Sequence, residues 1–273
     1  MAELDLPTLA QFVGLLLVAG ALAGLMAGLL GVGGGMIIVP VLFYVFTVLD
    51  VEPAYRMHMA VGTSLATIVV TSVMSVRAHW RRESIDWSVI RGWGPWLVLG
   101  VVLGSVVAGR LDAGGLKIVF GVAALVVAAY MAFVKVEYAL AKQPPQGPAK
   151  AVTASAIGGF STLIGIGGGT FTVPVLIMSS VAPRIAVGTA AAVGVFIAIP
   201  AATGFVVIGW GAENLPPMSL GYVSIPAFLA IIPMTSLFAP IGARIAHSIS
   251  PQWLKRAFAV FLLVNGTNIL LSA

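Results

Sequence analysis

The sequence contains no cysteine in its 273 residues. Disulfides, thiolate metal ligands and a nucleophilic thiol are therefore excluded. The three histidines, His58, His79 and His247, are too far apart along the chain to form a recognisable zinc motif. We therefore expect neither a metal site nor a cofactor.

Charged residues are also scarce, because they make up only 8% of the chain while hydrophobic residues make up 60%. Soluble domains carry roughly 25% charged residues, and a water-soluble core cannot absorb so much apolar surface. Apolar stretches of about 15 to 25 residues recur along the chain, which is the length that a helix needs to cross a hydrocarbon layer. The sequence therefore predicts an all-α polytopic membrane protein that is surrounded by a lipid bilayer.

Acidic residues are absent from the middle of every predicted span. All nine lie near span ends or in loops: Glu3, Asp5, Asp50, Glu52, Glu83, Asp86, Asp112, Glu137 and Glu213. A buried carboxylate proton relay is therefore not expected. The spans also lack an Asp pair, a Ser-His pair and a His-x-x-x-His motif, so we predict that the protein is not an intramembrane enzyme.

The net charge of +5 comes from Lys and Arg residues in short loops between the spans. Cytoplasmic loops of membrane proteins carry their basic residues in this way, so no nucleic-acid partner is expected. The first eight residues contain Glu3 and Asp5 but no Lys or Arg. They lack the basic region of a signal peptide, and we expect this segment to be retained.

A sequence repeat is the strongest internal signal. Gly31-Val32-Gly33-Gly34-Gly35, followed by Pro40, returns 134 residues later as Gly165-Ile166-Gly167-Gly168-Gly169, followed by Pro174. Two later elements return in the same order, Ala60-Val61-Gly62-Thr63 as Ala186-Val187-Gly188-Thr189 and Leu116-Lys117 as Leu254-Lys255. We predict a first transmembrane repeat over residues 1–135 and a second over 151–273. The linker 136–150 contains three prolines, which cannot continue a helix.

Each predicted repeat consists of a Gly-broken apolar stretch and three plain spans, at 57–76, 88–109 and 115–135, then at 183–209, 219–243 and 252–272. If the broken stretch crosses the membrane once, the two repeats are parallel, whereas a broken stretch that folds back as a hairpin makes them inverted. The parallel arrangement places seven Lys and Arg residues on each side of the membrane.

The inverted arrangement separates the basic residues much more clearly. It leaves only Arg56, Arg110 and Lys117 on one side and places eleven on the other: Arg77, Arg81, Arg82, Arg91, Lys135, Lys142, Lys150, Arg184, Arg244, Lys255 and Arg256. Because short cytoplasmic loops are enriched in Lys and Arg, we predict inverted repeats with a cytoplasmic linker. Both termini are then periplasmic, and the protein is a multi-pass protein of the cell inner membrane.

The glycine clusters predict a binding site. Helices that restart at about Gly35 and Gly169 would present unpaired N–H groups and a partial positive charge, which favour an oxyanion. Close helix packing is the alternative, and it explains isolated pairs such as Gly24 and Gly28. Matched clusters in corresponding halves, each followed by a proline, are typical of paired broken helices around a central site. The predicted substrate-binding glycines are Gly33, Gly34, Gly35, Gly167, Gly168 and Gly169.

Four hydroxyl side chains complete the predicted substrate site. Thr63 and Thr189 occupy matched positions near the start of a span, where a hydroxyl either bonds its own helix or faces a ligand. Ser64 follows Thr63 but has Ala190 as its counterpart. Thr170 stands where the first repeat has Met36, so the second half offers an additional donor.

The segments from Gly31 to Pro40 and from Gly165 to Pro174, with Val61-Gly62-Thr63-Ser64, resemble the signature of the sulfite exporter TauE/SafE family. This family is also called the toluene sulfonate uptake permease family, and the resemblance covers essentially the whole chain. The resemblance implies transport of sulfite, organosulfonates or other small anions. We therefore predict an alternating-access secondary transporter, with sulfite or an organosulfonate as its substrate.

Two other functions stay open at this stage. An anion channel is suggested by the missing ionisable coupling residue, and a non-transporting membrane scaffold or assembly factor would share the same hydrophobic plan. Saturable flux that a counter-substrate stimulates would favour the carrier over the channel. The expected partners are a small anionic substrate and the lipid bilayer, and the sequence leaves a homodimer open.

Overall fold

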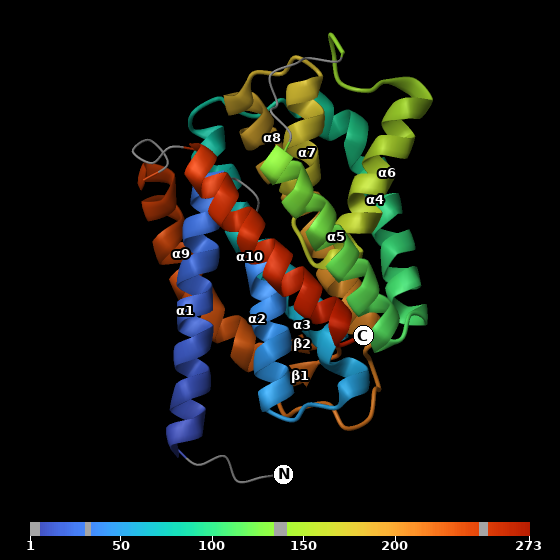
Figure 1. Ribbon diagram of the computed structural model, residues 1–273. Helices are drawn as coiled ribbons and strands as arrows, with labels where there is room; N and C mark the ends of the chain where they lie inside the picture. Colours follow the sequence, from blue (N-terminus) through green and yellow to red (C-terminus); the bar gives the residue numbers. More distant parts are fainter. Residues whose placement is uncertain (1–5, 31–33, 134–140, 246–250) are drawn as a thin grey trace.

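The computed structural model describes residues 6–30, 34–133, 141–245 and 251–273. Within these ranges the chain forms ten helices and one two-stranded ribbon (Figure 1). In order, they are α1 (Leu6–Leu30), α2 (Gly35–Val48), α3 (Pro53–Trp80), α4 (Trp87–Arg110), α5 (Ala113–Phe133), α6 (Gly147–Ile164), α7 (Gly169–Met178), α8 (Pro183–Ile208), β1 (Ser219–Leu220), β2 (Val223–Ser224), α9 (Ile225–Ile245) and α10 (Pro251–Leu271).

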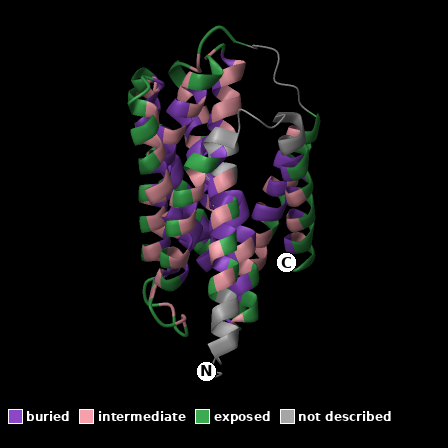
Figure 2. Cartoon of the chain, turned by 90° about the vertical axis from the view of Figure 1, so that its left-hand side faces the viewer, coloured by how far each residue is buried: buried purple, intermediate pink, exposed green. Residues whose placement is uncertain are grey.

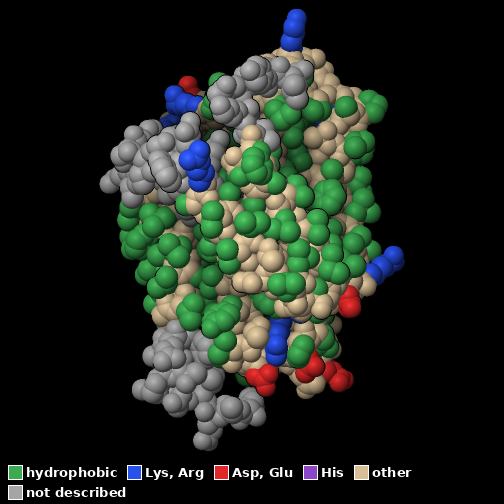
Figure 3. Space-filling model, in the orientation of Figure 1, with side chains coloured by type: hydrophobic (Ala, Val, Ile, Leu, Met, Phe, Trp, Pro, Cys, Tyr) green, Lys and Arg blue, Asp and Glu red, His purple; other side chains and the backbone are tan. Residues whose placement is uncertain are grey.

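Five helices in the described ranges are long and apolar enough to cross a membrane. They are Pro53–Trp80, Trp87–Arg110, Ala113–Phe133, Pro183–Ile208 and the Ile225–Gly242 part of α9. Hydrophobic side chains cover the broad middle of the face shown in Figure 3, and the Lys, Arg, Asp and Glu side chains lie mainly toward its two ends. The predicted all-α polytopic membrane fold is confirmed at this level.

Prolines and an aspartate mark where several helices begin. Pro53 and Pro183 stand in the first turns of α3 and α8, where the N–H that proline lacks would have no partner in the helix. Asp86 precedes α4, and its carboxylate accepts hydrogen bonds from the N–H groups of Ser88 and Val89. The Ser88 hydroxyl also donates to this carboxylate, at 2.6 Å, and these hydrogen bonds lower the pKa of Asp86.

Two predicted boundaries were wrong. The span expected from residue 219 begins only at Ile225, because the chain first turns at Gly221, with a φ of 53°, and pairs β1 with β2. The linker expected to end at Lys150 gives way to α6 at Gly147. Pro148 lies in the first turn of α6, where a proline is tolerated.

Helices of the two predicted repeats pack against each other in matched pairs. α1 packs along α9 and α6 along α4, while α3 packs on α8 and α5 on α10. A Cβ atom built on Gly24 of α1 would lie 2.7 Å from the Thr235 carbonyl oxygen, and one built on Gly158 of α6 would overlap the Leu97 carbonyl. The packing interpretation of Gly24 is therefore confirmed, and α6 approaches α4 in the same manner.

α3 and α8 form the centre of the bundle. α3 is the most enclosed of the five long helices, since 56% of its most apolar 18-residue segment is buried. The side chains of Leu65, Ile68, Val193 and Ile197 on these two helices are fully buried. Figure 2 shows the buried residues on the inner faces of the helices and the exposed ones on the outer faces.

The repeated Ala-Val-Gly-Thr element joins one half of the chain to the other. The Thr63 hydroxyl in α3 accepts a hydrogen bond of 2.9 Å from the N–H of Ser224, directly before α9. The Thr189 hydroxyl in α8 accepts one of 2.8 Å from the N–H of Asp86, directly before α4. Ser224 and Asp86 are 138 residues apart, the same offset that relates Leu254 to Leu116. Each threonine therefore satisfies a backbone donor at the start of a helix in the other half.

The glycine before each threonine allows this close approach. A Cβ atom on Gly62 would lie 2.6 Å from the Tyr222 carbonyl oxygen, and a Cβ atom on Gly188 would overlap the Ser84 carbonyl. Ser84 itself is fully buried. Neither Gly62 nor Gly188 therefore has room for a side chain.

We expect Gly188→Val to destabilise the folded protein by about 2 kcal/mol or more, because overpacking a close backbone contact typically costs about 1 to 3 kcal/mol. The measurement is the thermal unfolding midpoint and the monodisperse fraction of the detergent-solubilised protein. Gly14→Val is the matched control, since nothing lies within 4 Å of a Cβ atom at Gly14. A Gly188→Val protein as stable as the control would contradict the proposed contact.

Candidate functional site

Both broken helices restart where the sequence predicts. α2 begins at Gly35 and α7 at Gly169, and the preceding residues, Gly34 and Gly168, have φ angles of 72° and 76°. Glycine adopts this left-handed conformation without the steric cost that a side chain brings. Gly33, which was predicted to belong to the site, lies outside the described residues.

The first backbone N–H groups of each restarting helix have no acceptor within the described part of the chain. In α7 the N–H groups of Phe171 and Thr172 donate to the Gly168 carbonyl, whereas those of Gly169 and Thr170 donate to no residue in the described ranges. α2 follows the same pattern, because its first hydrogen bonds run from the third and fourth residues to Gly34. Free N–H groups and the positive end of a helix dipole favour an anion.

The two glycine clusters meet inside the bundle. A Cβ atom on Gly35 would overlap the Gly165 carbonyl oxygen and would lie 3.1 Å from the Cα of Ile166. The same carbonyl accepts a hydrogen bond of 2.9 Å from the hydroxyl of Ser64 in α3. Gly165 ends α6 with a φ of 70°. Ser64, a predicted site residue, therefore holds the end of α6 in place beside the start of α2.

Hydroxyl side chains gather around the start of α7. The hydroxyl oxygens of Ser161, Thr170 and Thr172 are buried and have no hydrogen-bond partner among the residues that the structure describes. The Ser161 oxygen lies 3.7 Å from a Cβ atom built on Gly168, and the Ser72 oxygen lies 3.8 Å from one built on Gly167. Thr170 was predicted from the sequence, whereas Ser72, Ser161 and Thr172 were missed.

A comparison of the repeats contained a signal for one of the missed residues. Thr172 stands at the position matched by Ile38, just as Thr170 stands at the position matched by Met36. Serine and threonine in a helix usually bond their own backbone, so these hydroxyls attract no special notice in a single sequence.

Apolar side chains close this polar group off in the present conformation. The Cγ2 atom of Ile68 lies 2.7 Å from a Cβ atom built on Gly167, and the Cγ1 atom of Val193 lies 3.3 Å from one built on Gly168. The Cδ1 atom of Ile197 is closer still to the second of these positions. These atoms are the ends of flexible side chains, so a ligand would reach Gly167 and Gly168 only if they moved.

Thr63 and Thr189 have structural partners. Both side chains are fully buried, and both hydroxyls accept a backbone N–H across the two halves of the chain. A contact of either hydroxyl with a ligand stays a prediction. Both threonines therefore connect the two halves of the chain by hydrogen bonds, a role that the sequence alone did not suggest.

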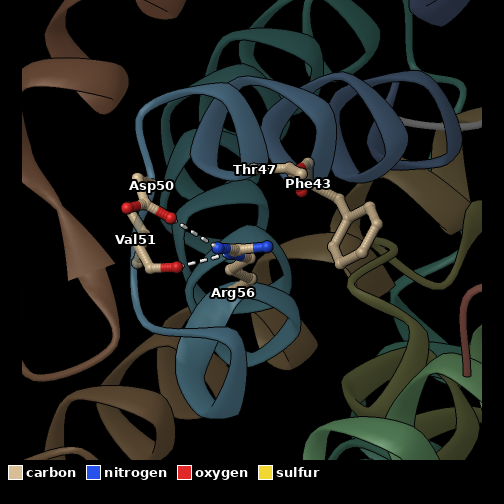
Figure 4. Close-up of polar contacts among 5 residues, drawn as sticks. All are labelled: Phe43, Thr47, Asp50, Val51 and Arg56. Carbon is tan, nitrogen blue, oxygen red and sulfur yellow. Dashed lines mark hydrogen bonds and ion pairs between the residues drawn. The ribbon is translucent and has the colours of Figure 1, made fainter.

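At the end of the bundle where α2 leads into α3, the basic side chains take part in structural contacts. Arg56 lies beside Asp50 and Val51 of the connecting loop (Figure 4), with its Nη2 atom 3.2 Å from a carboxylate oxygen of Asp50 and its Nε–H donating to the Val51 carbonyl. Lys117 donates to the Ser272 carbonyl at 2.6 Å and lies over the ring of Phe43.

A cavity of about 610 Å³ opens at this end of the bundle, and its lining includes Tyr55, His58, Lys117 and Tyr222. The Nε2 atom of His58 lies 3.1 Å from the Ala108 carbonyl oxygen, which fixes this ring nitrogen as the one that carries the proton. The Tyr222 ring packs on both His58 and Tyr55, and its burial raises the pKa of the phenol. The cavity is separate from the residues that surround Gly167 and Gly168.

Comparisons with known proteins agree with this architecture. The family model described as sulfite exporter TauE/SafE matches residues 16–269. A probable membrane transporter protein of Haemophilus influenzae is 35% identical over 95% of this chain and 98% of its own length. Similar proteins with that description occur in Methanocaldococcus jannaschii, 31% identical over 94% and 95% of the two chains, and in Bacillus subtilis, 24% identical over 94% and 96%. No solved structure matches the chain with significance.

We expect Thr63→Val and Thr189→Val each to lower the free energy of unfolding by about 1 kcal/mol, because each leaves a buried N–H without its acceptor. Thermal or denaturant unfolding in detergent measures the change. Thr203→Val is the control, because the Thr203 hydroxyl donates to the carbonyl of Ile199 in its own helix. A tenfold loss of substrate affinity without any loss of stability would instead show that these hydroxyls bind the ligand.

Proposed function

The chain belongs to the sulfite exporter TauE/SafE family, and we propose that it is a secondary transporter that carries a small anion across the cell inner membrane. Sulfite or an organosulfonate is the proposed substrate. The observation that carries the proposal is the pair of broken helices inside a bundle of apolar helices. The N–H groups at the starts of α2 and α7 have no acceptor among the residues that the structure describes. The descriptions of its relatives as probable membrane transporters support the same conclusion.

Interrupting a helix at membrane depth costs free energy, because backbone groups at the interruption lose their hydrogen-bond partners. Unpaired backbone groups cost several kcal/mol each in hydrocarbon, and they persist only where protein or a polar cavity surrounds them. Here such groups occur twice, and the two interruptions meet at Gly35 and Gly165. An oxyanion bound at such a helix start would accept hydrogen bonds from its free N–H groups, so the interruption would serve binding rather than packing alone.

We also propose that the two halves are inverted repeats. α1 begins at the lower end of the molecule in Figure 1, whereas its counterpart α6 begins at the upper end. The matched contacts of Thr63 with Ser224 and of Thr189 with Asp86 support a pseudo-symmetric relation between the halves. Alternating access would then arise from movement of one group of helices against the other around the glycine clusters.

A carrier accounts for the closure of the site better than a channel does. The side-chain ends of Ile68, Val193 and Ile197 lie against the second glycine cluster, where a conducting pore would need a continuous polar path. These side chains suit an occluded state that opens alternately to each side. A membrane scaffold would need no free donors at this depth, so substrate-dependent uptake separates the two functions.

In sealed vesicles we expect the wild-type protein to take up sulfite or a two-carbon sulfonate with saturable kinetics. Gly34→Val and Gly168→Val should each abolish this flux while the protein still inserts, because valine is strained at both φ angles and, at position 168, also blocks the approach to the start of α7. Gly14→Val should retain the flux. Wild-type flux in both cluster variants would remove the anion site from the glycines and leave them a packing role.

The proposed orientation places both termini in the periplasm, since eleven basic residues then fall on the cytoplasmic side and three on the other. A reporter that is active only in the cytoplasm should therefore be silent when it is fused after Ala273. The same reporter inserted in the loop that contains Pro144 should be active. Strong activity after Ala273 would rule out the inverted arrangement.

A further inference from the structure

We propose that the anion site is built on one side only, at the start of α7, and that it selects a singly charged sulfonate or hydrogensulfite group. The hydroxyls of Ser161 and Thr172 and the N–H groups of Gly169 and Thr170 are its donors. This inference rests on the proposed function and names the donors and the charge of the substrate.

The unpartnered hydroxyls are the first observation. Ser161 and Thr172 are fully buried, and neither of their hydroxyls, nor that of Thr170, has a partner within the described ranges. A hydroxyl buried without a hydrogen bond destabilises the fold. Ser161 lies beside Gly168, and Thr172 lies on the buried face of α7, so these two hydroxyls indicate a requirement that the folded chain alone does not satisfy. Thr170 lies two residues before Thr172 and therefore faces another side of the helix.

The first repeat shows which side chains occupy the matched positions around the start of α2. Met36 and Ile38 match Thr170 and Thr172, and both are buried in the start of α2. Ala27 is the sequence counterpart of Ser161 at the same offset of 134 residues. Apolar residues thus occupy all three matched positions in the first half, so the hydroxyls in the second half are not a requirement of the broken helix itself.

The start of α2 is a poor place for an anion. The Gly165 carbonyl oxygen lies directly against Gly35, and the Ala23 carbonyl oxygen lies 3.0 Å from a Cβ atom built on Gly34. Carbonyl oxygens carry partial negative charge and would repel an oxyanion. The nearest atoms around Gly168 belong instead to Ser161 and to the aliphatic ends of Val193 and Ile197.

The donors at α7 are all neutral, and this sets the charge of the ligand. The side chains closest to Gly167 and Gly168 are those of Ile68, Ser72, Ser161, Val193 and Ile197, and none of them is charged. The cost of moving an ion out of water rises with the square of its charge, so a site without a counter-charge favours a monoanion over a dianion. The aliphatic side chains would pack against the short alkyl group of a sulfonate.

The test is direct binding to purified, correctly folded protein with methanesulfonate and sulfate as probes at neutral pH. We expect the wild-type protein to bind methanesulfonate at least tenfold more tightly than sulfate. The double variant Ser161→Ala/Thr172→Val should lose at least tenfold in methanesulfonate affinity. Its unfolding midpoint without ligand should stay the same or rise, because unpartnered buried hydroxyls have been removed.

Two controls separate binding from structure. Thr162→Val removes a neighbouring hydroxyl that donates to the Gly158 carbonyl of its own helix at 2.8 Å, and it should change the affinity by less than twofold. Thr172→Ser keeps the donor and should retain most of the affinity. An affinity loss that follows the loss of stability, or one that Thr172→Ser also suffers, would overturn the assignment of the hydroxyls.

The remaining outcomes distinguish this inference from the proposed function. Wild-type methanesulfonate affinity in the double variant would overturn the site while sulfite flux in vesicles still supported a transporter. Equal affinity for sulfate and methanesulfonate would overturn the charge selection. Intact sulfite flux without methanesulfonate binding would overturn the inference alone, whereas absence of both flux and binding would overturn the proposed function as well.

Discussion

Every N–H and C=O group at membrane depth must find a partner within the protein, because hydrocarbon offers none. Continuous helices meet this requirement by themselves, but α2 and α7 start inside the bundle and cannot. Their first N–H groups are tolerated because α3, α8 and the opposite glycine cluster surround them, and the Gly165 carbonyl is held by the Ser64 hydroxyl. The placement of the most enclosed helix, α3, and the meeting of the clusters both follow from this need. The requirement is left unmet at the start of α7, where we propose the binding site.

Close backbone contacts at glycine residues are the second recurring feature of the fold. In lipid the hydrophobic effect does not drive helices together, so association depends on small residues that let backbones approach. Gly24 against Thr235 and Gly158 against Leu97 are such contacts, and each joins a helix of one half to a helix of the other. In the proposed alternating access, these pairs, α1 with α9 and α4 with α6, would move as rigid units, while the aliphatic ends of Ile68 and Ile197 would rearrange.

Composition and periodicity were sufficient to predict the helices, and the repeat was sufficient to predict the restarts at Gly35 and Gly169. The six residues before Ile225 were mistaken for helix because their apolar character masks the turn at Gly221, whose conformation depends on the contact with α8. The roles of Thr63 and Thr189 could not be predicted, since their partners lie in the other half of the chain. Ser161 and Thr172 were missed for a related reason, because whether a helical hydroxyl finds a partner is decided by tertiary packing.

The hydrogen bond between Ser224 and Thr63 joins residues that are 161 positions apart in the sequence. α3 therefore emerges from the ribosome and enters the bilayer long before the backbone that its threonine binds has been synthesised. The same holds for α1, because its Gly24 packs against Thr235 of α9, which is near the end of the chain. Folding of such non-local contacts is slow, and exposed surfaces on the early helices are open to wrong partners in the meantime. Biogenesis of this protein should consequently depend on whatever shields α1 and α3 during translation, and a chain stopped before α9 should be recognised as incomplete by the quality-control machinery of the cell.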